Sequence, residues 1–423
     1  MALNQNILAR LARRANVPAE DTLPVAWAFA QFFLLLCGLY VVRPLRDEMG
    51  IASGVENMQW LFSGTFVAML AVVPLYGWAV SRWSRRTVVP RVHGCLAVTM
   101  VLAFVATEAL PPTMQGPIAA AIFIWISVFN VLVVSVFWSL LADVFSPEAG
   151  RRTFGVIAAA GTAGALLGPT LAATLVRWVP PTSLLLIAAL LLAAASAAAY
   201  KLDRAADRAV PRDAEPMGGS LWAGFVTMFK TPRLRGISVY LLCMTWISTT
   251  LYFAQAHVID QNVTDSAERT ALFAEMDLAV NLLALTVQLT LTGRLMLRWG
   301  LAVILVALPM VSGAALAAVA LFPSLGVVVV AQVVRRAVNF SLARPAREVL
   351  YTDVSLEAKY KGKNVVDTLV YRGGDAVAGW AYSGLGALGV GLSATAGLGV
   401  AIAAGWAWLA HRLGADATPS PPS

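Results

Sequence analysis

Charged side chains occur in the middle of long apolar stretches of the sequence, where a charge needs a partner or a ligand. Arg335 and Arg336 lie near the centre of the stretch 325–351, and Asn339 follows one turn later. A charge at the centre of a bilayer costs about 2.5 to 3.5 kcal/mol on insertion scales, so these side chains should face a bundle interior. Guanidinium groups bind carboxylates and phosphates through paired hydrogen bonds. The pattern therefore predicts an anion site, and because helical neighbours diverge by about 100°, we favour Arg336 as the residue on its axis.

A second polar stripe lies in the apolar stretch 363–388. Thr368, Arg372 and Asp375 are spaced at i, i+4 and i+7, which places them on one helical face. Two interpretations remain open at this stage. Arg372 and Asp375 either form a structural ion pair within the helix or contact a substrate or proton.

The first apolar stretch ends in a cluster of charges. Arg43 and Arg46 there are either substrate ligands or residues that snorkel to the membrane interface. Asn130 and Asn281, near the middle of the fourth and eighth stretches, fit ligand contact or hydrogen bonding between helices. With few acids nearby, we expect an electropositive cavity. The candidate substrate-binding residues are Arg43, Arg46, Asn130, Asn281, Arg335, Arg336, Asn339, Arg372 and Asp375.

The composition requires a membrane environment for these residues. Of 423 residues, 59% are hydrophobic and 13% are charged, whereas soluble domains carry about 25% charged residues. A membrane-spanning helix needs about 20 mostly apolar residues. The sequence contains twelve such stretches: 22–42, 57–80, 88–110, 117–142, 153–178, 182–201, 236–257, 271–293, 299–321, 325–351, 363–388 and 391–411. We therefore predict an all-α polytopic membrane protein with twelve transmembrane helices.

The basic residues predict the orientation of the chain. Most of the 31 Lys and Arg residues fall in alternate loops, on the side that also holds both termini. The positive-inside rule then places both termini in the cytoplasm of a cell whose plasma, or bacterial inner, membrane holds the protein. Because these residues are spread over loops, the net charge of +8 does not indicate nucleic-acid binding.

The two halves of the sequence are similar to each other. The segment 77–86 after the second stretch is similar to 293–300 after the eighth, about half the chain further on. Both segments fall on the predicted cytoplasmic side, so the halves should be parallel six-helix repeats. We expect an N-terminal half at 1–200, a cytoplasmic linker with a surface amphipathic helix at 201–235, a C-terminal half at 236–411 and a disordered tail at 412–423.

The repeated cytoplasmic segments also predict a gate. Each half carries basic residues after its second span and acidic residues after its fourth. We predict that ion pairs between them latch the cytoplasmic side when the protein opens outward. The pairs are Arg82 or Arg86 with Asp143 or Glu148, and Arg298 with Asp353 or Glu357.

These loop motifs resemble those of the major facilitator superfamily. Gly77, Arg82, Arg85 and Arg86 match its loop pattern, while Ser81 stands where that family has an acid. The resemblance implies two parallel six-helix repeats that transport by alternating access.

A longer segment is similar to the ATP/ADP translocase family of plastids and intracellular bacteria. Residues 345–367 contain Pro345-Ala-Arg347-Glu348 and then Glu357-Ala-Lys359-Tyr-Lys361-Gly362-Lys363, followed by Arg372-Gly-Gly. They are similar in order and spacing to that family's P-x-[KR]-E and L-x-x-E-x-K-x-K-G-K motifs. Residues 40–47 resemble its first-helix motif, with Arg46 in the place of a functional lysine. The family's acids in the fourth and seventh helices fall near Ile126 and near Thr249 or Thr250. The resemblance implies nucleotide transport by exchange.

These observations predict a secondary transporter of an organic anion, such as a nucleotide or phosphorylated metabolite. The alternative is a proton-coupled carrier of an uncharged or cationic compound, protonated at Asp375 or Asp47. We expect no enzyme, since no catalytic cluster lies at a plausible depth. We also expect no metal site and no cofactor. The expected partners are the anionic substrate, membrane lipid and protons as the coupling ion, and we expect a monomer.

Overall fold

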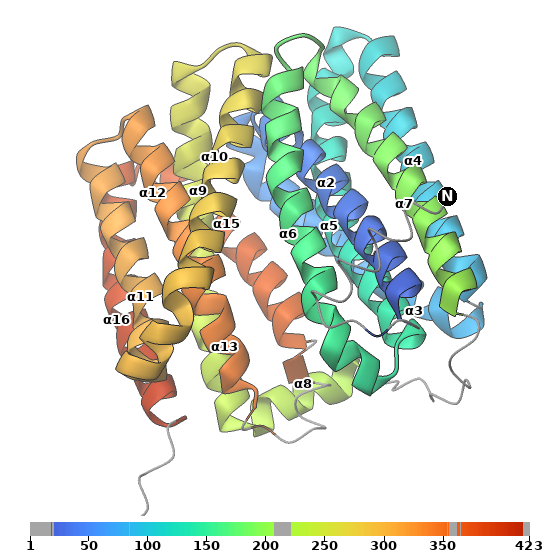
Figure 1. Cartoon of the computed structure of the whole chain (residues 1–423). Helices are drawn as coiled ribbons and strands as arrows, with labels where there is room; N and C mark the ends of the chain where they lie inside the picture. Colours follow the sequence, from blue (N-terminus) through green and yellow to red (C-terminus); the bar gives the residue numbers. More distant parts are fainter. Residues whose placement is uncertain are drawn as a thin grey trace, which may run out of the picture. The chain divides into compact units, whose positions relative to one another are not determined.

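All regular secondary structure in the described part of the chain is helical (Figure 1). The computed structural model describes residues 18, 21–83, 85–206, 221–352, 354, 362–363 and 365–417. The long helices are α2 (Thr22–Ala52), α3 (Met58–Arg82), α4 (Arg85–Ala109), α5 (Gln115–Val144), α6 (Pro147–Leu175), α7 (Leu184–Ala206), α9 (Pro232–Asn262), α10 (Ser266–Val287), α11 (Gly293–Leu321), α12 (Leu325–Val338), α15 (Tyr371–Ala387) and α16 (Leu392–Ala415). The shorter helices include α8 (Leu221–Lys230) and α13 (Arg344–Leu350).

The helices have the length and composition of membrane spans. Ten segments of the described residues are long and apolar enough to cross a membrane. One of these, Ser266–Leu321, has 56 residues and holds both the eighth and the ninth predicted spans. Gly300 divides it, because its φ of 76° breaks the helix at a conformation that glycine adopts readily. The eleventh predicted span contains α15, which carries charged residues. The predicted all-α polytopic membrane fold is therefore confirmed.

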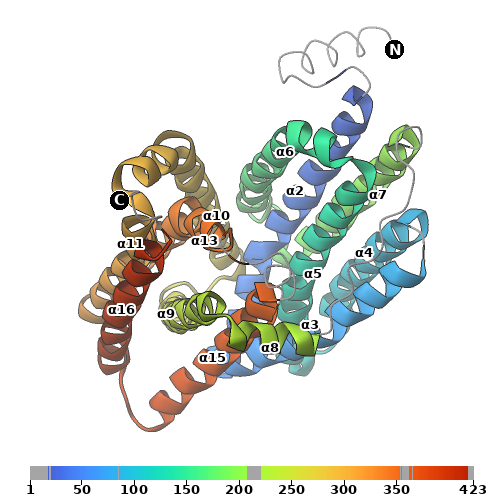
Figure 2. The same cartoon turned by 90° about the horizontal axis from the view of Figure 1, so that it is seen from below.

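The chain divides into two compact units, and the first is built around α2. Unit 1 comprises Met1–Ser53, Val67–Pro216 and Asp265–Leu278. Within it α2 packs against α5, α6 and α7, and α4 packs against α7 (Figure 2). Glycines bring α6 very close to α2: a Cβ at Gly164 would lie 2.5 Å from the Phe33 carbonyl oxygen, and one at Gly168 2.6 Å from that of Cys37. Small residues allow this approach between membrane helices.

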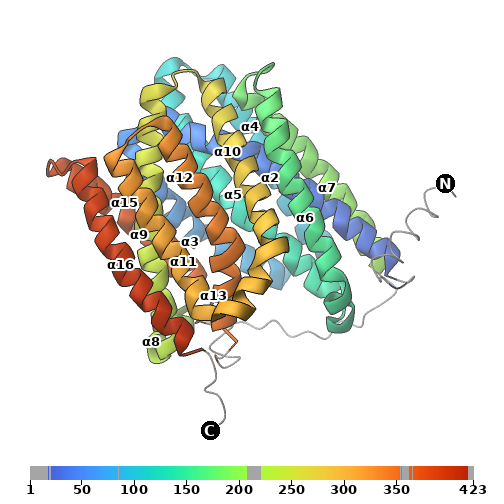
Figure 3. The same ribbon diagram turned by 60° about the vertical axis from the view of Figure 1, so that its left-hand side comes forward.

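The second unit is built around α9. Unit 2 comprises Gly54–Phe66, Met217–Thr264 and Ala279–Ser423. In this unit α12, α15 and α16 pack against α9, and α11 lies beside α16 (Figure 3). Tyr240 of α9 is buried against the edge of the Trp406 ring, with 5.1 Å between the ring centroids, and its hydroxyl donates to the Leu305 carbonyl oxygen at 3.4 Å. This packing fixes the core helices that carry the polar residues described below.

Helix occupies parts of the segments expected to be linker and tail. In the expected linker 201–235, α7 continues to Ala206, α8 forms at Leu221–Lys230 and α9 begins at Pro232. In the expected tail 412–423, α16 continues to Ala415. Residues 207–220 and 418–423 lie outside the described part of the chain.

Among the described residues of unit 2, three π turns interrupt the helices, at Gln288–Thr292, Asn339–Ala343 and Val366–Val370. A π turn widens the helix and changes which carbonyl groups are bonded within it. Side chains of the first π turn bond carbonyls of the second: Gln288 Nε2 donates to Phe340 O at 3.1 Å, and Thr292 Oγ1 donates to Ser341 O at 2.9 Å. Such turns are frequent at functional sites. The second follows the helix with the two central arginines, and the third directly precedes α15.

Candidate functional site

Arg335 is a buried guanidinium in α12 of unit 2. Its residue is 8% exposed, and its Nε and Nη2 donate to the side-chain oxygen of Gln332, one turn earlier, at 3.2 and 2.9 Å. Among the described residues no carboxylate oxygen lies within 4.0 Å of it. Gln332 is itself 1% exposed. A neutral amide therefore orients Arg335 and leaves its positive charge uncompensated at hydrogen-bond distance.

Asp375 of α15 joins that helix to α9. Its Oδ2 lies 3.7 Å from Arg372 Nη1, one turn away on the same helix. Its Oδ1 accepts a hydrogen bond from the Thr249 hydroxyl of α9 at 3.4 Å. Arg335 is also within electrostatic range of this carboxylate. The intrahelical ion pair, one of the two alternatives left open by the sequence, is thus present in the structure.

These side chains form a group with an excess of positive charge. We call Thr249, Gln332, Arg335, Arg336, Arg372 and Asp375 the α12–α15 cluster; it has three guanidinium groups and one carboxylate, all within unit 2. Arg336 is partly exposed, in contrast to its buried neighbour Arg335. Asn339, at the start of the second π turn, has a buried Oδ1 with no hydrogen-bond partner among the described residues. The cluster can provide charge and hydrogen-bond donors to an anion.

The Arg372–Asp375 contact makes a testable prediction. Changing Arg372 to Gln should lower the free energy of unfolding by about 1 to 3 kcal/mol, because the largely buried carboxylate loses its charged partner. Adding Asp375→Asn should restore most of the loss, since the double variant leaves no unpaired charge. Thermal unfolding of the purified proteins measures both effects. Wild-type stability in Arg372→Gln, combined with lost ligand binding, would instead assign this arginine to the substrate.

A second cluster joins α2 to the first part of α10 within unit 1. Arg269 donates to both carboxylate oxygens of Glu48, from Nε at 2.7 Å and from Nη2 at 3.0 Å. The side chains of this pair are 12% and 1% exposed. Deeper along the helices, Arg43 Nε lies 3.4 Å from Asp277 Oδ2, with side chains 19% and 1% exposed. These are two largely buried ion pairs between the same two helices.

Arg46 completes this α2–α10 ion-pair cluster. Its guanidinium bonds the neighbouring Asp47 carboxylate and lies over the Phe123 ring, 5.2 Å from the centroid. The cluster therefore contains three arginines and three acids: Arg43, Arg46, Arg269, Asp47, Glu48 and Asp277. The sequence predicted that few acids surround Arg43 and Arg46, and this is wrong. Asp277 provides the counter-charge of Arg43. The two residues are distant in sequence, and they meet because α10 packs against α2.

The remaining predicted residues lie on other parts of the helices. Asn130 of α5 belongs to unit 1 and Asn281 of α10 to unit 2, and both are partly buried. Four gating candidates are exposed, namely Arg82, Asp143, Glu148 and Arg298. The side chain of Arg86, and Asp353 and Glu357 entirely, lie outside the described residues. The latch of the cytoplasmic gate therefore stays a prediction.

Five residues of the two clusters were not selected from the sequence as site residues: Thr249, Gln332, Glu48, Arg269 and Asp277. Asp277 had a usable signal, because it is an acid inside the predicted span 271–293. Gln332 also had one, since it lies three residues before Arg335 on a helix. Glu48 and Arg269 lie at the ends of spans, where charges are common, so their types and positions did not distinguish them.

The fold is that of a polytopic helical membrane protein with charged side chains inside its spans. More specifically, the chain belongs to the Major Facilitator Superfamily, whose sequence pattern matches residues 24–355. This superfamily consists of transporters rather than enzymes. No curated protein sequence matches the chain.

Solved structures of other transporters share this fold. A POT family transporter in complex with a thioalcohol-conjugated peptide is similar with a TM-score of 0.67 and 13% identity, over 93% of this chain and 96% of that chain. The nucleoside transporter NupG has a TM-score of 0.63 and 14% identity, over 94% and 99%. A bacterial homologue of the iron transporter ferroportin, in an inward-facing state, has a TM-score of 0.64 and 14% identity, over 91% and 98%. At this identity the likeness shows the fold alone.

Proposed function

We propose that the chain is a secondary transporter of an organic anion, such as a nucleotide or a phosphorylated metabolite. The observation that carries the proposal is Arg335, a buried guanidinium in a membrane span whose described hydrogen-bond partner is the neutral amide of Gln332. A buried charge with no counter-charge at hydrogen-bond distance is costly. A bound anion supplies that counter-charge, and the planar fork of the guanidinium suits phosphate or carboxylate oxygens.

The surrounding charges favour the same class of substrate. Arg336 and Arg372 add positive potential to the α12–α15 cluster, and Asp375 offsets only part of it. By contrast, the α2–α10 ion-pair cluster has equal numbers of arginines and acids. We therefore assign anion binding to the α12–α15 cluster.

The choice of nucleotide or phosphorylated metabolite rests on sequence similarity. Residues 345–367 and 372–374 resemble motifs of the ATP/ADP translocase family. The similar solved structures are named for iron, nucleosides and peptides, so the shared fold leaves the substrate open. Exchange of one anion for another is the transport mode that the resemblance favours.

Alternating access requires contacts that form on one side of the membrane and open again during transport. In the proposed orientation, with both termini in the cytoplasm of a bacterial cell, the α2–α10 ion-pair cluster lies toward the outer side. Its two buried ion pairs would hold the outer part of α10 against α2. The predicted pairs of Arg82, Asp143 and Glu148 would act on the cytoplasmic side. The proposed carrier is a monomer in contact with membrane lipid.

Transport by the purified protein in proteoliposomes tests this function. Radiolabelled nucleotides and sugar phosphates are supplied outside vesicles that are empty, loaded with unlabelled anion, or set up with a pH gradient. We expect saturable uptake of at least one phosphorylated compound, stimulated by internal anion or by the gradient. Uptake of none of these anions, together with proton flux driven by an uncharged or cationic compound, would contradict the proposal.

The second candidate is a proton-coupled carrier of an uncharged or cationic compound. The observation that favours it is Asp375, a carboxylate buried in a span and bonded to Thr249. Proton coupling through this residue predicts that Asp375→Asn uncouples uptake from the pH gradient while exchange of substrate continues. Coupling through Asp47 would instead leave the gradient dependence of Asp375→Asn unchanged.

A further inference from the structure

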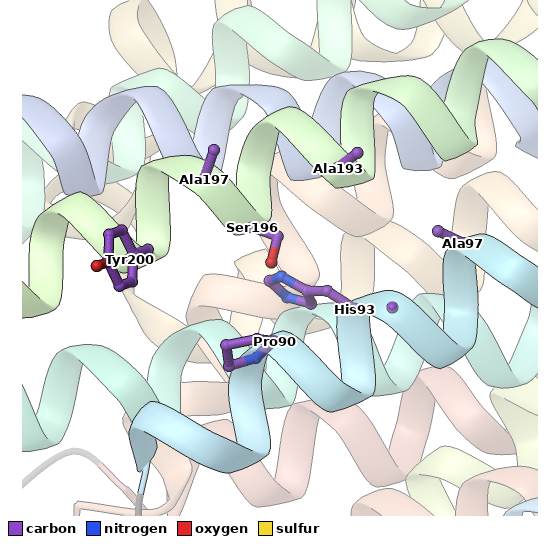
Figure 4. A pocket seen from close by; sticks show the side chains of 8 residues that line it. Pro90, His93, Ala97, Ala193, Ser196, Ala197 and Tyr200 are labelled. Atoms are coloured by element: carbon purple, nitrogen blue, oxygen red, sulfur yellow. The ribbon is translucent and has the colours of Figure 1, made fainter.

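A groove lies between α4 and α7 of unit 1 (Figure 4). Its volume is about 440 Å³ and its lining is mostly apolar. Small residues leave room for the hollow, because its lining includes Gly94 and Ala97 of α4 and Ala193 and Ala197 of α7. The lining residues of each helix span eight positions, from Pro90 to Ala97 and from Ala193 to Tyr200, which is about 10 Å along a helix axis.

Large apolar side chains near the groove show which solvent it faces. On the same two helices, Val98 is 59% exposed, Val101 42% and Leu190 71%. In a membrane-spanning protein such side chains contact lipid. A groove among them is in reach of acyl chains, and its length along the helices suits one extended chain.

The groove ends in basic residues. Tyr200 lines that end and is 53% exposed, and the Arg204 guanidinium lies over its ring, 4.6 Å from the centroid. Arg91, next to the lining residue of α4, lies over the Trp83 ring at 5.2 Å. Asp203 is the acid nearest to them in the α7 sequence. Aromatic and basic residues of this kind gather at the level of lipid headgroups, so this end of the groove has positive charge at that level.

Polar groups lie inside the groove, close to its basic end. His93 is 1% exposed, and neither ring nitrogen has a hydrogen-bond partner among the described residues. Ser196, one turn from Tyr200, has its hydroxyl directed toward the imidazole (Figure 4). His93 and Ser196 each lie about one helical turn from the lining residue nearest the basic end, Pro90 on α4 and Tyr200 on α7.

We propose that this groove is a binding site for one anionic phospholipid. An acyl chain fills the hollow between α4 and α7, and the phosphate binds Arg204 and Arg91. Lipid tails are as apolar as the helices, so the apolar lining gives little preference among lipids. The preference for an anionic headgroup comes from the two arginines. In the proposed orientation the lipid belongs to the cytoplasmic leaflet, but the site itself does not depend on what is transported.

Native mass spectrometry of the whole protein in detergent tests the site, with phosphatidylglycerol and phosphatidylcholine as the probes. We expect one phosphatidylglycerol to bind more tightly than phosphatidylcholine. Each arginine near the membrane surface should contribute about a five-fold preference, so Arg204→Gln should weaken phosphatidylglycerol binding about five-fold. Ala197→Trp, which fills the hollow, should remove the binding of this one lipid.

A matched control separates the groove from general surface charge. Arg412 of α16 lies over the Trp408 ring at 4.4 Å, the same four-residue arrangement as Arg204 and Tyr200, and it is also exposed. We expect Arg412→Gln to leave the tightly bound phosphatidylglycerol unchanged. Equal affinity for the two lipids, or equal losses in Arg204→Gln and Arg412→Gln, would overturn the proposal. A thermal unfolding curve for each variant shows whether the protein is folded. If Ala197→Trp does not fold, the comparison of Arg204→Gln with Arg412→Gln still tests the site.

Discussion

Replacing Glu48 by Gln is expected to lower the free energy of unfolding by about 3 to 5 kcal/mol, the cost of breaking a buried ion pair from one side. The carboxylate of Glu48 is 1% exposed and accepts two hydrogen bonds from Arg269, at 2.7 and 3.0 Å. The variant leaves a largely buried guanidinium opposite a neutral amide. Thermal or denaturant unfolding of the purified protein measures the loss.

A neighbouring ion pair provides the control for this effect. Arg177 lies 3.5 Å from Glu275, also in unit 1, but these side chains are 67% and 55% exposed. Exposed pairs contribute about 0 to 1 kcal/mol, so Glu275→Gln should change stability little. The double variant Glu48→Leu with Arg269→Met should recover most of the stability lost by Glu48→Gln, because no buried charge is left unpaired.

The same double variant tests whether the pair moves during transport. A permanent apolar contact between α2 and α10 should slow turnover if these helices separate in each cycle. A stable double variant that transports at the wild-type rate would show that the pair is structural only. Similar losses of stability in Glu48→Gln and Glu275→Gln would contradict the assignment of Glu48 to a buried ion pair.

Replacing Arg335 by Gln is expected to weaken substrate binding by about 1.5 to 3 kcal/mol, the contribution of hydrogen bonds to a charged group, or roughly ten- to hundred-fold. Gln332 would lose its charged donor, but two neutral amides can bond each other, so the fold should be kept. Arg335→Lys should restore binding only in part, because lysine keeps the charge and lacks the planar fork. Binding is measured by the concentration dependence of uptake and of thermal stabilisation by substrate.

Two variants separate a specific arginine from a general loss of charge. Arg412→Gln removes an exposed positive charge from the same unit and should leave binding unchanged. Arg336→Gln removes the adjacent charge, which the sequence favoured as the residue on the site axis. Equal binding by wild type, Arg335→Gln and Arg336→Gln would contradict an anion site in the α12–α15 cluster.

The helices could be predicted from sequence because each span needs a long apolar segment, whatever its neighbours are. The breaks within them were harder to predict. Gly300 is the second residue of the predicted stretch 299–321, and only its φ of 76° shows that the helix turns there. The residue types of Asn339–Ala343 do not indicate a π turn. Two carbonyl oxygens of this turn accept hydrogen bonds from side chains about 50 residues earlier in the sequence, a contact that depends on tertiary packing.

The candidate site was predictable in its residue types and less so in its pairings. An arginine inside an apolar span indicates a need for a partner, which identified Arg335 and Arg372. Helical geometry also predicts that residues three apart are neighbours, and Asp375 does lie beside Arg372. Partners from other helices do not follow in this way. Glu48 and Arg269 are 221 residues apart, and their contact depends on how α10 packs against α2.

Uptake of a nucleoside monophosphate compared with the same nucleoside without its phosphate tests the central claim most directly. The two compounds differ only in the anionic group, and each is supplied to proteoliposomes of wild type and of Arg335→Gln. The account predicts saturable uptake of the monophosphate by wild type, little uptake of the nucleoside, and a roughly ten- to hundred-fold weaker apparent affinity for the monophosphate in Arg335→Gln. Preferred uptake of the nucleoside, with the same affinity in both proteins, would contradict it.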